Sequence, residues 1–154
     1  MEVIDMGAGY ALGLHGPVLI QLWEDGTPDE GAVGALAAAK SLAGRGHAAT
    51  GSLVVVAEHA SLPSAEARQH LSQLPSELGK GVGVALVREG EGFRSAAVRA
   101  VMTGIMMFSR DPVPHQILST VGEGAAWLRD RMPGLDPAGL EAAVSKLRAQ
   151  LKGG

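Results

Sequence analysis

The chain has 154 residues, of which 46% are hydrophobic, and a mean hydropathy of +0.16, values that fit one domain with its own core. The formal net charge of −3 does not suggest the basic surface of a nucleic-acid-binding protein. The absence of cysteine excludes disulfides, thiolate metal sites and cysteine catalysis in this chain. The N-terminus lacks the pattern of a signal peptide, and no apolar run approaches the roughly 20 residues of a membrane span. We therefore expect a cytoplasmic protein that has no membrane-spanning segment.

Two apolar segments near the N-terminus predict an antiparallel pair of strands. They cover residues 10–14 and 18–23 and are separated by His15-Gly16-Pro17, a sequence that favours a tight turn. A further short strand is expected at Val3-Ile4.

The first two helices carry recognisable start signals. Thr27 is expected to be the N-cap of the first helix, with Pro28 at its first position and Glu30 completing a capping box. Either Ser61 or Ser64 is expected to cap the second helix, because a serine hydroxyl can accept a hydrogen bond from a free amide of the first turn.

Two later apolar runs, residues 53–57 and 82–87, and a last short segment at residues 115–119 predict strands of a mostly parallel sheet, each followed by a helical pattern. The expected order is ββαβαβαβα plus a C-terminal helix. The fold class is therefore α/β, a single domain over residues 1–154 in which helices pack on a sheet with an antiparallel N-terminal strand pair. Its core is expected at about 9–131 and its C-terminal helix at about 136–152.

The helical segment 91–108 has an apolar arc wider than a helix lying on a sheet requires. The sheet is expected to cover the centre of this arc, formed by Ala97, Val101, Ile105 and Phe108. The flank of the arc comprises Val98, Met102 and Met106. We expect it to be covered either by the C-terminal helix or by a second copy of the chain. We favour a homodimer, with these three residues as the candidate interface.

The order of elements and the ending Ala125-Ala126-Trp127-Leu128 resemble the STAS fold of anti-sigma-factor antagonists, in its SpoIIAA-like branch. The resemblance covers about residues 9–130 in element order. It implies a non-enzymatic protein-interaction module in bacterial signalling or regulation. The SpoIIAA-like branch is also similar in fold to lipid-binding CRAL-TRIO domains, and this similarity implies an alternative function as a carrier of a small apolar or lipid-like ligand.

Regulatory STAS proteins carry a phosphorylated serine after a central strand. The resemblance makes Ser61 and Ser64 candidates for a phospho-switch, although neither follows an aspartate as in that family. The capping role of either serine is the simpler interpretation.

Other residues at the carboxyl ends of the strands give weaker signals. Arg94 and Gly92 form a candidate anion-binding site at a helix N-terminus, although Arg94 can equally extend into water. Glu58 and His59, with Arg94, are the titratable residues that a metabolic enzyme, the third alternative, would have to use. No catalytic motif and no metal-ligand spacing is present in the sequence, so we expect neither an enzyme nor a cofactor.

Overall fold

A computed structural model describes residues 1–90, 94–107, 109–110 and 113–153, with the side chains of residues 94 and 95 excepted. It shows a six-stranded mixed sheet with the strands in sequence order. The strands are β1 (Glu2–Gly7), β2 (Tyr10–His15), β3 (Val18–Trp23), β4 (Thr50–Val56), β5 (Gly81–Arg88) and β6 (His115–Leu118). The pairs β1–β2 and β2–β3 are antiparallel, and the three later pairs are parallel.

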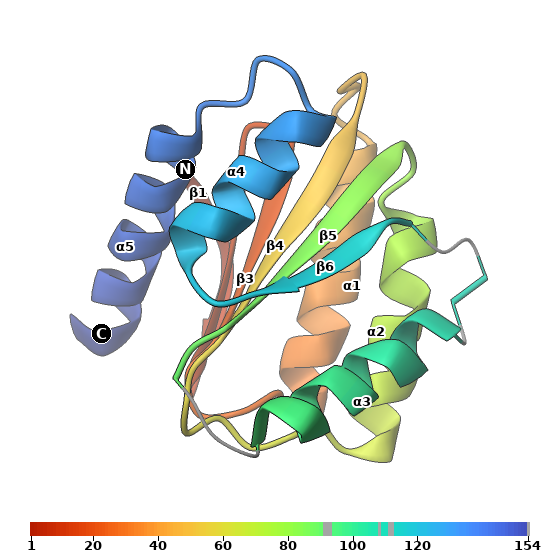
Figure 1. Ribbon diagram of the computed structural model, residues 1–154, viewed down its shortest axis with the longest axis vertical. Coiled ribbons are helices and arrows are strands. Elements are labelled where there is room, and N and C mark those ends of the chain that lie inside the picture. The colour runs from red at the N-terminus through yellow and green to blue at the C-terminus, as the bar shows by residue number, and fades with distance from the viewer. Residues whose placement is uncertain (91–93, 108, 111–112, 154) are drawn as a thin grey trace.

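Five helices cover the two faces of this sheet (Figure 1). One face carries α1 (Asp29–Ala43), α2 (Ala65–Glu77) and α3 (Arg94–Met107). The other carries α4 (Val121–Arg131) and α5 (Pro137–Gly153). None of the helices within the described part of the chain is both long enough and apolar enough to cross a membrane.

Alternating side chains of the central strands build two separate cores. On β3, Leu19 and Trp23 point to the face of α1, α2 and α3, while Ile20 points to the face of α4 and α5. Strands buried on both faces need long apolar stretches, which β3 provides except at Gln21, β4 at residues 53–56 and β5 at residues 84–87.

The predicted fold class is confirmed, and β3 has the predicted bounds. The N-terminal strand at Val3-Ile4 is longer than expected, because β1 pairs with β2 from Glu2 to Gly7. The predicted cap of the first helix is wrong by one residue. Pro28 is the N-cap of α1, without a side-chain hydrogen bond, since its extended backbone (φ −67°, ψ 156°) places its carbonyl to accept from Ala32 N at 3.0 Å.

The expectation that the centre of the α3 arc faces the sheet is also wrong. Met102 and Met106, each 6% exposed, pack in the core between α3 and the sheet, and Val98 packs against the same cluster. Val101 and Ile105 are half-buried and line a groove between α2 and α3. The wide arc is therefore divided between the sheet and α2 of the same chain. Phe108 lies outside the described residues.

Candidate functional site

A partly enclosed cavity of about 80 Å³ lies between the sheet, α2 and α3. The sheet contributes Gln21, Val54 and Leu86, and α3 contributes Val98, Met102 and Met106. Leu71 and Leu74 of α2 complete the wall. The surface is mainly apolar, as in most small-molecule sites.

The cavity extends to the carboxyl ends of β3 and β4, where Trp23 and Val56 line it. Its rim includes Ser61, Leu62 and Pro63, the segment that precedes α2, and Leu62 is 39% exposed. Trp23, at the end of β3, lines the path between this rim and the interior. Ligands of α/β sheets bind outside the carboxyl ends of the strands, so this end of the cavity is where a ligand is expected.

Gln21 is the one fully buried polar side chain of the cavity wall among the described residues. It is 2% exposed, and its Nε2 donates a hydrogen bond to Ser52 Oγ at 2.9 Å. Ser52 Oγ donates its single proton to the carbonyl oxygen of Leu19, also at 2.9 Å, so it has to accept from Gln21. This fixes the orientation of the amide. Gln21 Oε1 then accepts no hydrogen bond from the described residues.

The described residues that line the cavity include no aspartate, glutamate, lysine, arginine or histidine. Two of them, Val101 and Ile105, also line the outer groove between α2 and α3. The cavity and the outer groove therefore adjoin at these two side chains.

A cluster of ion pairs lies at the carboxyl ends of the strands, on the face of the sheet that α5 covers. Arg148 of α5 donates through Nε to Glu24, which follows β3, and through Nη2 to Glu89 Oε1 at 2.5 Å. Arg148 was not predicted from the sequence to lie at this edge. The sequence feature that could have indicated Arg148 is its position directly after Leu147, which belongs to the buried stripe of the C-terminal helix. Since the guanidinium is paired with both carboxylates, the cluster links α5 to the ends of β3 and β5, and Arg148 offers no unpaired positive charge to a ligand.

The candidate phospho-switch serines both have structural roles. Ser64 is the N-cap of α2, accepting from Ala67 N at 3.1 Å and donating to Asp29 Oδ1 at 2.6 Å. Ser61 donates to the carbonyl oxygen of Asp25 at 3.2 Å. The prediction that a serine caps α2 is confirmed for Ser64. Both hydroxyls lie on exposed residues, and their phosphorylation stays a prediction.

The other predicted site residues are not brought together. Gly92 and the side chain of Arg94 lie outside the described residues, so the anion site stays a prediction. Glu58 and His59 are exposed in the loop after β4. Within the described ranges, no three histidine or acidic residues are grouped so that they could hold a metal ion.

The predicted interface residues Val98, Met102 and Met106 line the cavity. Two of the three are buried inside their own chain, so a partner could reach them only if α3 moved. Their role in an interface stays a prediction.

No protein-family model, curated protein or solved structure matches the chain. The resemblance to the STAS fold therefore stays a prediction, and the function has to be inferred from the cavity.

Proposed function

We propose that this protein is a non-enzymatic binding protein that carries a small, mostly apolar ligand between its sheet and α3. The observation that carries the proposal is the apolar cavity that extends to the carboxyl ends of β3 and β4, where the exposed Leu62 is part of its lining. Protein interiors are packed as densely as organic crystals. An unfilled apolar cavity is an exception to this dense packing, and a bound ligand would explain it. The side chains of Met102 and Met106 are unbranched and can repack around an incoming molecule.

The size of the cavity limits the ligand. Its volume of about 80 Å³ is roughly half of the ~150 Å³ cavity that is known to hold a benzene molecule. It can therefore enclose a short chain or part of a larger molecule, whose remainder would lie towards Leu62 at the rim. Movement of α3 would enlarge the cavity, because Val98, Met102 and Met106 form one of its walls.

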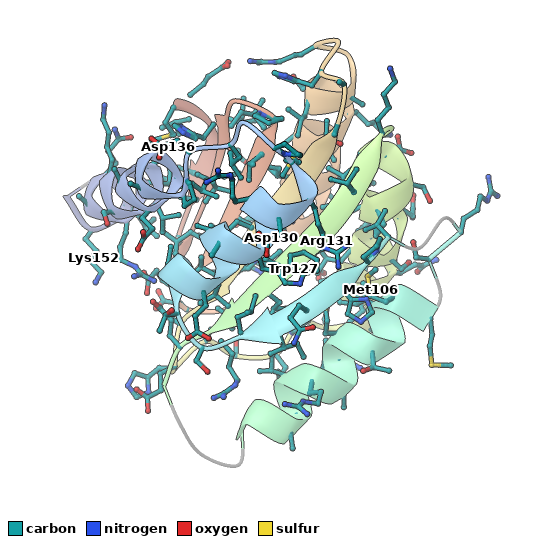
Figure 2. The ribbon with its side chains drawn as sticks, turned by 45° about the horizontal axis from the view of Figure 1, so that its top comes forward. Met106, Trp127, Asp130, Arg131, Asp136 and Lys152 are labelled. Carbon is teal, nitrogen blue, oxygen red and sulfur yellow. The ribbon has the colours of Figure 1, made fainter. Side chains whose placement is uncertain are left out.

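Trp23 provides a direct test, since its indole lines the cavity and is 2% exposed. The second tryptophan, Trp127, lies on the opposite face, where Arg131 stacks over its ring at 4.3 Å (Figure 2). We expect the fluorescence of the Trp127→Phe variant, in which Trp23 is the only tryptophan, to change saturably on titration with n-pentanol. The fluorescence of Trp127 in a Trp23→Phe variant should not respond. A flat titration of Trp23 at all soluble concentrations would contradict the proposal.

The interaction module expected from the resemblance stays a prediction, as do its protein partner and the homodimer. The burial of Met102 and Met106 within the chain favours the carrier over an interface formed by these residues.

A further inference from the structure

We infer that the cavity is specific for a neutral ligand with one hydroxyl or amide group, which hydrogen-bonds to Gln21, and that it discriminates against hydrocarbons and against carboxylates. This inference rests on the proposed function, because it concerns the same cavity.

The amide of Gln21 has hydrogen-bonding capacity that its own chain does not use. A glutamine side chain has two donor hydrogens and an acceptor oxygen, and Ser52 takes one of the donors. Oε1 and the second hydrogen of Nε2 have no partner among the described residues. The residue is 2% exposed and lines the cavity, so these atoms can be satisfied only from the cavity side.

The ligand group that satisfies both atoms must donate one hydrogen bond and accept another. An alcohol does so through one oxygen, and a primary or secondary amide does so through its N–H and C=O. A hydrocarbon of the same length would leave the buried amide without partners, which is costly in a protein interior. Discrimination against hydrocarbons follows from this cost.

Discrimination against charged ligands follows from the composition of the wall. A carboxylate or an ammonium group that enters the cavity loses its hydration, and the described lining residues offer no opposite charge in return. Gln21 would be its only fully buried polar partner among the described lining residues, with the hydroxyls of Thr27 and Ser61 on less buried residues, and these neutral groups do not replace the hydration shell of an ion. The polar group of the ligand therefore has to be neutral.

The position of Gln21 also orients the ligand. Gln21 precedes Trp23 by two residues on the same face of β3, so it lies farther from the rim than Trp23 does. The hydroxyl or amide group should consequently be deep in the cavity, with the apolar chain along Trp23 and towards Leu62.

Three probes of equal chain length test this inference: n-pentanol, n-pentane and pentanoate, each titrated against the fluorescence of Trp23 in the Trp127→Phe background. We expect n-pentanol to bind most tightly. Gln21→Met retains the length of the side chain and removes both polar atoms, and it should weaken n-pentanol binding roughly thirtyfold, the value of two net hydrogen bonds, without weakening n-pentane binding. Gln73→Met, on the exposed surface of α2, is the matched control and should leave all three affinities unchanged.

The outcomes separate this inference from the proposed function. If n-pentane and n-pentanol bind equally well and Gln21→Met changes neither, the cavity is a binding site but the role of Gln21 is wrong. Tightest binding of pentanoate would also overturn the inference. If no probe changes the signal of Trp23, the proposed function itself fails, and the inference fails with it.

Discussion

Ser52 of β4 accepts a hydrogen bond from Gln21 of the neighbouring strand β3, with Nε2 and Oγ 2.9 Å apart. Both residues are buried, at 0% and 2% exposure, on a mainly apolar face of the sheet. Because the serine hydroxyl is itself anchored on the carbonyl oxygen of Leu19, the amide is held in one orientation. A fixed polar group inside an apolar cavity is suited to recognising one group of a ligand.

Removal of Ser52 Oγ should destabilise the fold. Ser52→Ala deprives the buried Gln21 amide of its acceptor, and we expect a loss of about 1–3 kcal/mol in the free energy of unfolding, measured by urea denaturation. Adding Gln21→Met to this variant should recover part of the loss, because both polar partners are then absent. Ser145→Ala, on the exposed side of α5, serves as the control. Equal stability of Ser52→Ala and the unmodified protein would show that the pair has no energetic role.

Filling the cavity should abolish ligand binding while the fold is retained. Val98→Phe places an aromatic ring in the space beside Met102, and we expect n-pentanol binding to be lost without a lower unfolding midpoint. The exposed Val33 of α1 provides the matched control, Val33→Phe, which should bind normally. Unchanged binding by a folded Val98→Phe protein would place the ligand elsewhere.

Tyr10 should titrate at unusually high pH. Burial and the hydrogen bond from its hydroxyl to Asp5 Oδ2, at 3.1 Å, raise the pKa of Tyr10 from 10.0 to about 12. Its protonated form is favoured in the folded state, so this contribution to stability is complete below pH 10.0 and is lost as the pH rises towards about 12. Tyr10 is the only tyrosine of the chain, so tyrosinate absorbance reports it directly. Asp5→Asn should lower the midpoint of this titration. A midpoint near 10.0 in the unmodified protein would contradict the burial of the Tyr10 hydroxyl.

The ion pairs of Arg148 should hold α5 on the sheet. Arg148→Met leaves the carboxylates of Glu24 and Glu89 without their shared partner, and we expect a loss of about 1–2 kcal/mol in unfolding free energy, smaller at high salt because the cluster is partly exposed. Arg148→Lys keeps the charge but cannot bind both carboxylates with a planar fork, so it should be intermediate. A destabilisation independent of salt would instead indicate lost packing of the arginine stem.

The parts of the fold that depend on local pattern were predictable. The apolar segment 18–23 predicted the bounds of β3, and Ser64 caps α2 through the amide of Ala67, at 3.1 Å, as expected for one of the two serines before this helix. The side of α3 that faces the sheet was not predictable. The spacing of its apolar residues defines an arc on the helix, but it does not show that α2 covers part of this arc. The signal for the site was present in Gln21, a single polar residue inside an apolar strand.

Methyl NMR of the methionines tests the central claim most directly. The chain has six methionines, of which Met102 and Met106 line the cavity, while Met132, 4% exposed, is equally buried in the core on the opposite face. Met107, 74% exposed, reports nonspecific contact with the surface. On titration with n-pentanol, the account predicts saturable shifts of the Met102 and Met106 methyl signals, with those of Met132 and Met107 unchanged. Shifts of Met132 or Met107 equal to those of Met102 and Met106, or no saturable shift of the latter pair, would contradict a ligand site between the sheet and α3.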